Sequence, residues 1–388
     1  MSSDRAATRL GQLPPYLFAQ LERRIADKRA AGVDIISLGI GDPDLPTPGV
    51  VVDALVDAAR DPGTHRYPSN RGRDSFRDAI ATFYDRRFGV SLDPATEIIP
   101  ALGAKEAIAN LNFAFLDPGD VALASDPGYP VYTSGPIIAG AEPVAMPLVP
   151  ELGFQPDLDA IPADVRRRAK LMYVNYPNNP TGAVIEDDFF ERLVEFARAN
   201  DIIVVHDNAY SEITYDGYRA PSFLATPGAK DVGLEVFSLS KTYNMTGWRS
   251  GAVVGNPDLV GDYWQLKTNI DSGMFEAVQE ASVAALLSDQ SSVDEMCAVY
   301  TRRRDTLVAA LRAIGLDVDP PKGTIYLWAR VPAGQTSAGF AERVLEEASV
   351  VISPGSAYGA SGEGFVRMSL TIDDDRLNEA AERISALV

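Results

Sequence analysis

The stretch Ser238-Leu239-Ser240-Lys241 sets one lysine among small hydroxyl side chains, and Arg249 follows eight residues later. The apolar residues Val236 and Phe237 are typical of the end of a short buried strand. Lys241 therefore falls where the chain leaves a sheet, at the edge where open α/β folds bind ligands. The two serines and the arginine can hold an anion there. A lysine amine in such a place becomes a nucleophile or a Schiff-base partner when its surroundings lower its pKa.

A phosphate-bearing aldehyde is the commonest partner of such a lysine, so the candidate cofactor is pyridoxal phosphate. The chain has only seven lysines, and Lys241 has the best surroundings for this chemistry. A surface lysine that simply follows a strand explains the stretch equally well, because short motifs also match by chance. The rest of the chain has to decide between the two.

Further polar side chains follow other apolar runs. Asp207 comes after the apolar run at residues 202–206, and a buried carboxylate there could pair with the nitrogen of a pyridine ring. Tyr210 and Asn179 could donate hydrogen bonds to the phenolic oxygen of the same ring. A lone aspartate after a strand is more often a helix cap. Several such residues at successive strand ends favour the cofactor site.

Strands and helices alternate through most of the chain. Strand-like runs lie at residues 97–100, 121–124, 171–174, 202–205 and 234–237, and a helix with one apolar face lies between two of them. This alternation predicts a mainly parallel sheet with helices on both faces. After Gln279 the pattern is mostly helical, with short strands that predict a smaller α+β domain. The boundaries we expect are an N-terminal arm and part of the small domain at 1–47, a large domain at 48–284, and the rest of the small domain at 285–388.

Composition excludes several classes of function. The formal net charge of −19 over 388 residues repels nucleic acid and anionic membranes. Two histidines and the single Cys297 cannot build a zinc or thiolate site, so we expect no metal. The first residues lack the apolar core of a signal peptide, and no run of eighteen apolar residues occurs. We therefore expect a soluble, cytoplasmic protein.

Four motifs occur together in this chain: Asn179-Pro180-Thr181-Gly182, Asp207-Asn208-Ala209-Tyr210, Ser238-Leu239-Ser240-Lys241 and Phe365-Val366-Arg367-Met368-Ser369. In order and spacing they resemble the class I/II aminotransferases of pyridoxal-phosphate fold type I, and the resemblance spans nearly the whole chain. It implies a seven-stranded sheet in the large domain and transfer of an amino group between an L-amino acid and a 2-oxo acid, with 2-oxoglutarate as the expected acceptor. It also implies that Lys241 holds the cofactor as a Schiff base and, once freed, moves the proton between the substrate Cα and the cofactor C4′.

The resemblance assigns further roles one position at a time. It implies a catalytic set of Lys241, Asp207 and Tyr210. For the phosphate it implies the turn at Ala104 and Lys105, completed by Ser238, Ser240 and Arg249. Tyr129 would stack on the pyridine ring, and Tyr67 would reach the phosphate of a neighbouring subunit, which implies a homodimer with shared active sites. The substrate-binding set would be Tyr16, Ile40, Gly41, Asn179, Arg71 and Arg367, with Arg367 as the clamp for the α-carboxylate. Without the resemblance, Arg367 would be taken for a surface arginine on a strand.

Within the family, residues 13–18, 38–48 and 126–132 resemble the LL-diaminopimelate aminotransferases most. That subgroup tends to carry an acidic residue before the glycine of the turn at residues 67–72, where it can meet the distal ammonium of the substrate. Arg71 stands there in this chain. A cation would repel that ammonium and attract a distal carboxylate, so aspartate or glutamate is an alternative amino donor.

Two other functions have to be weighed. A pyridoxal-phosphate-dependent C–S lyase or decarboxylase would share the cofactor residues, but Arg367 and the absence of a cysteine or histidine base near the cofactor turn favour transamination. A transcriptional regulator with an aminotransferase-like domain needs a DNA-binding module, and the short, non-basic N-terminus leaves no room for one.

Overall fold

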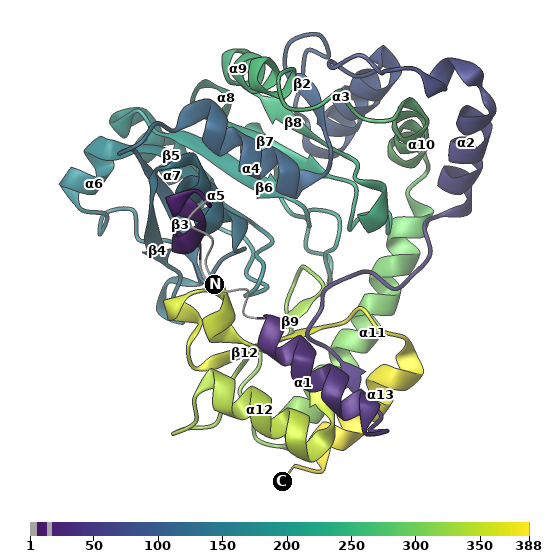
Figure 1. The fold of residues 1–388 in the computed structure, drawn as a ribbon, viewed down its shortest axis with the longest axis vertical. Helices are drawn as coiled ribbons and strands as arrows, with labels where there is room; N and C mark the ends of the chain where they lie inside the picture. The colour runs from purple at the N-terminus through teal and green to yellow at the C-terminus, as the bar shows by residue number, and fades with distance from the viewer. Residues whose placement is uncertain (1–5, 14–17, 388) are drawn as a thin grey trace.

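The apolar runs of the sequence form one central sheet in the computed structural model, which describes residues 6–13 and 18–387. The strand order is β2-β8-β7-β6-β5-β3-β4 (Figure 1). β8 runs antiparallel to its neighbours β2 and β7, and all other pairs are parallel. The predicted fold, a mainly parallel seven-stranded sheet, is confirmed. Its strands are β2 (Ile98–Ala101), β3 (Val121–Asp126), β4 (Glu142–Pro147), β5 (Ala169–Val174), β6 (Ile203–Asn208), β7 (Gly233–Ser238) and β8 (Gly251–Gly255).

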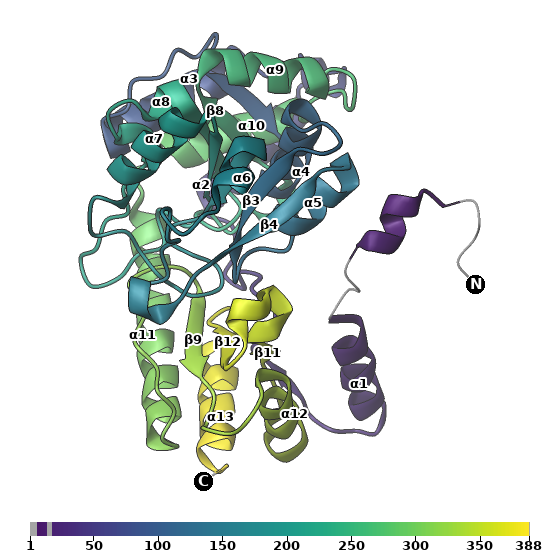
Figure 2. The same cartoon turned by 90° about the vertical axis from the view of Figure 1, so that its left-hand side faces the viewer.

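Helices cover both faces of this sheet because its strands are apolar on both sides. On β5, Leu171 and Tyr173 pack in one core and Met172 and Val174 in the other, as the two-residue repeat of a strand requires. Helices α4 (Ala104–Phe115), α5 (Val131–Ala139) and α9 (Pro257–Lys267) close the first core. The second core is closed mainly by α3 (Asp74–Phe88), α7 (Phe189–Asn200), α8 (Ala229–Val232) and α10 (Glu276–Leu287). Figure 2 shows α4 and α5 on one side of the sheet and α7 and α8 on the other.

A smaller layer is built from the two ends of the chain. β1 (Ile36–Ser37) pairs in parallel with β10 (Val350–Val351), and β9 (Tyr326–Arg330), β12 (Phe365–Ser369) and β11 (Ser353–Pro354) form an antiparallel sheet. Its helices are α1 (Phe18–Ala30), α11 (Ser291–Ala313), α12 (Ser337–Ala348) and α13 (Asp374–Ser385). The pairing of β1 with β10 supports the predicted grouping of residues 1–47 with 285–388. The domain boundaries themselves stay a prediction.

The loop after β1 leads from this layer to the large domain. It runs from β1 to α2 (Gly49–Arg60), and the buried side chain of Arg303 on α11 holds it. The two terminal nitrogens of Arg303 donate to the carboxylate of Asp44 at 2.8 and 2.9 Å, and its Nε donates to Asp374 on α13 at 2.6 Å. This bidentate ion pair fixes the position of Gly39 and Gly41 earlier in the loop.

Sequence analysis missed β4 and β8. β4 is the edge strand, it contains Pro143 and Pro147, and most of it is not buried, so it lacks a continuous apolar run. β8 is short and has glycine at both ends. The short helix α6 (Ala163–Arg168) completes the α-helices. No helix in the described part of the chain is long and apolar enough to span a membrane.

Candidate active site

The N-terminus of α4 forms an anion site at the end of β2. The register of the sheet aligns Ala101 on β2, Gly251 on β8 and Ser238 on β7 side by side. Gly103 then turns the chain with a φ of +83° and begins α4 without a side-chain cap. A Cβ on Gly103 would lie 2.2 Å from a terminal nitrogen of Arg249, so the guanidinium lies directly against this turn. Free N–H groups, the helix dipole and a guanidinium together suit a phosphate.

Lys241 follows β7 and reaches across to the loop of the smaller layer. Its Nζ donates to the carbonyl oxygen of Gly41 at 2.7 Å. Burial lowers the pKa of the Lys241 amine, and the cations of Arg367 and Arg249 add to this shift. Tyr326 and Asp42 oppose it. A lowered pKa leaves a larger fraction of the lysine side chains neutral, and the neutral amine is the nucleophile.

Asp207 is buried near the end of β6, three residues before Tyr210. Tyr132 on α5 donates to its Oδ2 at 2.7 Å. The other oxygen, Oδ1, is also buried, and no described residue donates a hydrogen bond to it. Burial raises the pKa of this carboxyl to about 6. The unpaired oxygen is suited to a protonated ring nitrogen, which would supply both a donor and a compensating charge.

Asn175 fixes two of the predicted residues relative to each other. Its side-chain nitrogen donates to the backbone oxygen of Asp207 at 2.7 Å, and its side-chain oxygen accepts from the backbone N–H of Asn179 at 2.8 Å. Tyr129 lies above the same strand ends, with its ring 5.9 Å from that of Tyr132 in an edge-on arrangement. The ends of β3, β5 and β6 are therefore connected by side chains.

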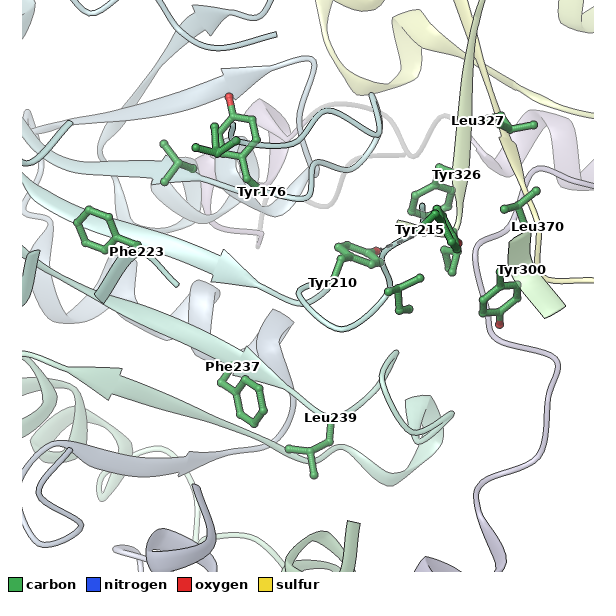
Figure 3. Close-up of a cluster of buried hydrophobic side chains, with 14 of the residues drawn as sticks. Tyr176, Tyr210, Tyr215, Phe223, Phe237, Leu239, Tyr300, Tyr326, Leu327 and Leu370 are labelled. Carbon is green, nitrogen blue, oxygen red and sulfur yellow. Dashed lines mark hydrogen bonds between the residues drawn. The ribbon is translucent and has the colours of Figure 1, made fainter. Parts of the chain in front are cut away.

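Tyr210 faces a tyrosine from the smaller layer. Its hydroxyl donates to that of Tyr326 on β9 at 3.5 Å, a long hydrogen bond (Figure 3). Burial opposes ionisation of Tyr326, but the cations of Arg367 and Lys241 hold the pKa of its phenol below the ordinary value. A Cβ on Gly41 would lie 2.0 Å from the Tyr326 hydroxyl, so only glycine fits at residue 41.

Arg367, in the middle of β12, is buried beside Asn179. One terminal nitrogen donates to the side-chain oxygen of Asn179 at 3.0 Å, and the other donates to the carbonyl oxygen of Gly39 at 2.8 Å. Its Nε is buried and has no acceptor among residues 6–13 and 18–387. A guanidinium with two bonds made and N–H groups left over is suited to bind a carboxylate.

Some predicted residues lie elsewhere. Arg71 was predicted to face the substrate, but its guanidinium lies 4.3 Å from the ring centre of Trp264 and donates to the carbonyl oxygen of Ala95 at 2.9 Å. These two contacts keep it out of the group formed by Lys241, Asn179 and Arg367. The side chains of Tyr67, Lys105 and Ile40 are exposed, and Tyr16 lies outside the described residues.

Three contributing residues were missed by the sequence analysis, namely Tyr132, Asn175 and Tyr326. Tyr132 is three residues after Tyr129, a spacing that puts both on one side of a helix start, and this signal could have found it. Asn175 directly follows a predicted strand, as Asp207 was expected to do. The sequence around Tyr326 has no pattern that predicts its role, because only the pairing of β9 with β12 brings it beside Arg367.

These residues fit pyridoxal phosphate. The unpaired Oδ1 of Asp207 matches the ring nitrogen, the α4 N-terminus with Arg249 matches the phosphate, and Lys241 matches the aldehyde. Five of the predicted cofactor residues are buried at strand ends or in the turns that follow them, namely Ser238, Ser240, Asn179, Asp207 and Tyr210.

Known proteins give the same result. Residues 33–384 match the family model for aminotransferase class I and II. An LL-diaminopimelate aminotransferase of Moorella thermoacetica is 56% identical over 378 residues, 97% of each chain. The enzyme of the same name from Syntrophobacter fumaroxidans is 52% identical over 381 residues, 98% of each chain.

Solved structures agree as well. The substrate-bound structure of BacF from Bacillus subtilis has a TM-score of 0.94 and 38% identity over 98% of this chain and 97% of that one. A double mutant of the aspartate aminotransferase of Thermus thermophilus has a TM-score of 0.92 and 30% identity over 99% of both chains. The chain therefore belongs to the class I and II aminotransferases and is a pyridoxal-phosphate-dependent transaminase of fold type I.

Proposed function

We propose that this enzyme moves the amino group of LL-diaminopimelate to 2-oxoglutarate in the cytoplasm. Three groups meet in the site and carry this proposal: a partly buried lysine of lowered pKa, a buried carboxylate with one free oxygen, and a buried arginine with a free N–H group. The choice of donor is supported by relatives named LL-diaminopimelate aminotransferase, which are 48–56% identical over nearly the whole chain.

Each residue has a role in this reaction. Pyridoxal phosphate, when bound, supplies a reactive aldehyde and an electron-withdrawing ring. The N-terminus of α4 and Arg249 bind its phosphate, and Asp207 keeps the proton on its ring nitrogen. Arg367 binds the α-carboxylate of the substrate, which orients the Cα–H bond towards Lys241. The amine of Lys241 would take the proton from the substrate Cα as a general base and return it as a general acid.

We further propose that two copies of the chain form a dimer with shared sites. Val52 and Val56 lie one turn apart on α2 and are exposed, and so are Tyr67 and Phe275. A Cβ on Gly273 would lie 3.2 Å from Pro68, so the loop before α10 adjoins the turn that carries Tyr67. Exposed large apolar side chains on neighbouring elements are typical of a protein interface. In a dimer the hydroxyl of Tyr67 would reach the phosphate site of the other copy.

Within its own chain, Arg71 gives no support to a dicarboxylic donor. Its charge is held between Trp264 and the carbonyl oxygen of Ala95, so it does not favour a distal carboxylate in the pocket of its own chain. The similarity to LL-diaminopimelate aminotransferases supports LL-diaminopimelate as the donor. Aspartate and glutamate remain the comparison substrates in the experiments below.

Borohydride reduction of the holoenzyme should attach the cofactor to Lys241. The reason is that Lys241 combines a lowered pKa with a place between the phosphate site and the substrate clamp. Peptide mapping by mass spectrometry checks the labelled residue, and the Lys241→Ala variant, which should carry no label, is the control. A label on the exposed Lys105 or on the buried Lys267 would overturn the assignment.

Asp207→Asn should stabilise the cofactor-free protein and slow the holoenzyme. Burial raises the pKa of Asp207 from 3.8 to about 6, so the folded state binds this proton more tightly and stability falls as pH rises from about 4 through about 6. At pH 7 the carboxylate costs about 3 kcal/mol, which the amide removes. In the holoenzyme the amide leaves the ring nitrogen without its counter-ion, and turnover should fall on the order of a hundredfold or more.

Urea unfolding of the cofactor-free protein at pH 4 and pH 7 checks the first effect, and single-turnover kinetics check the second. Asp258→Asn, on α9, serves as the control and should change neither quantity. Equal stability of the Asp207→Asn variant and the wild type at pH 7, together with normal turnover, would show that Asp207 is only a structural partner of Tyr132.

Wild-type enzyme should prefer LL-diaminopimelate to glutamate and aspartate, and Arg71→Glu should change the ratio of kcat/KM values by less than about threefold. A residue fixed on Trp264 has no contact through which to discriminate donors, whereas a charge in the pocket would change the ratio on the order of a hundredfold. Steady-state assays of the three donors with 2-oxoglutarate measure this ratio. Arg71→Met, which removes the charge but keeps an apolar chain on Trp264, is the control. A large gain for LL-diaminopimelate in Arg71→Glu would put Arg71 in the substrate pocket.

The enzyme should elute with twice its chain mass of 41.7 kDa in size-exclusion chromatography with light scattering. The double substitution Val52→Asp and Val56→Asp should shift it to the monomer, because two carboxylates would be buried at the interface. Leu152→Asp, an equally exposed apolar residue beyond the edge strand β4, should leave the mass unchanged. A dimer that tolerates both aspartates on α2 would place the interface elsewhere.

A further inference from the structure

Tyr326 and Arg367 lie on neighbouring strands of the small sheet. The register pairs Arg367 with Trp328, so Tyr326 is two residues away on β9 and lies on the same face of the sheet as Arg367. The guanidinium carbon of Arg367 is 4.0 Å from the centre of the Tyr326 ring. Both side chains are buried, and a desolvated cation over an aromatic face is a strong form of this contact.

The Tyr326 ring is held in place from two further sides. Gly41 lies so close to its hydroxyl that no side chain fits between them. Tyr210 packs against it edge-on, with ring centres 6.0 Å apart and an angle of 70° between the rings. The ring is therefore a fixed surface, and it belongs to the same sheet as Arg367.

The hydrogen bonds of Arg367 do not by themselves fix its orientation. Their acceptors, Asn179 and the carbonyl oxygen of Gly39, lie in loops that follow β5 and β1. A guanidinium that tilts about the line between these two acceptors would turn its remaining N–H groups away from a carboxylate. Contact with aromatic faces sets the plane of the group, and of its two aromatic neighbours Tyr326 is nearer, at 4.0 Å, than Tyr358, at 4.6 Å. The plane decides where those N–H groups point.

We propose that Tyr326 is a positioning residue whose ring face holds the guanidinium plane of Arg367, so that its free N–H groups meet the α-carboxylate of the substrate. This role rests on the proposed function of Arg367 as the carboxylate clamp. It requires the ring of Tyr326 and not its hydroxyl. The orientation of Arg367 is then set by a residue of the small sheet and does not depend on the hydrogen bond to Asn179.

Two substitutions separate the ring from the hydroxyl. Tyr326→Leu removes the aromatic face, and it should raise the KM of the amino donor and the Kd of glutarate about tenfold while kcat changes less than about threefold. Tyr326→Phe keeps the face, so its Kd for glutarate should stay within about threefold of the wild-type value. Glutarate binding to the holoenzyme is measured by isothermal titration calorimetry, which does not depend on turnover.

Tyr215→Phe is the matched control. The hydroxyl of Tyr215 donates to the carbonyl oxygen of Thr324 at 2.6 Å, so its loss disturbs the start of β9 without touching Arg367. This variant should bind glutarate as the wild type does, even if its thermal midpoint falls. Cofactor content and thermal midpoint are measured for every variant, so that a misfolded protein is recognised.

Three results would contradict the proposal. Unchanged glutarate binding in Tyr326→Leu, with binding lost in Arg367→Leu, would show that Arg367 is the clamp but that Tyr326 does not position it. Equal losses in Tyr326→Phe and Tyr326→Leu would assign the effect to the hydroxyl. Glutarate binding that survives Arg367→Leu would overturn the carboxylate clamp itself, and the role of Tyr326 with it.

Discussion

The site depends on a buried carboxylate oxygen that has no donor. An unpaired buried acceptor is unfavourable, and a folded protein usually avoids it. Glu235 on β7, the strand next to that of Asp207, shows the usual solution: it is also buried, and it accepts from Tyr84, Ser222, Asn208, the N–H of Phe223 and His206 at 2.6–3.1 Å. Burial opposes ionisation there, but these donors lower the pKa of Glu235. Asp207 has one donor and a raised pKa. The same sheet therefore holds one carboxylate for structure and keeps a second available to a ligand.

The large sheet was predictable because its strands are continuous apolar runs separated by an amphipathic helix or by turns. The residues at the strand ends were predictable for the same reason, since Asp207 and Lys241 follow such runs directly. β4 was not predictable, because an edge strand that is exposed and contains two prolines has no apolar pattern to detect. The contact of Tyr326 with Arg367 depends on the register of two strands that are about forty residues apart, and a local pattern does not encode that register.

Arg71 shows what a charge argument leaves open when the direction of a side chain is unknown. The residue type and the turn were read from the sequence, and the repulsion of an ammonium group by a guanidinium is sound physics. The indole of Trp264 and a backbone carbonyl oxygen nevertheless take up this guanidinium on the surface of the large domain. A long side chain on a turn has several partners within reach, so its sequence position does not determine which one it meets.

The antiparallel strand β8 has a consequence for how the protein acquires its cofactor. β8 lies between β2 and β7. The phosphate site therefore needs residues 98–104 together with residues 238–251, which are far apart in the sequence. Contacts between segments so far apart in the chain form slowly, after local structure is in place. A nascent chain that has not yet paired β2 with β8 has no phosphate site. Tight binding of a phosphate at this site therefore requires that β2, β8 and β7 have already paired.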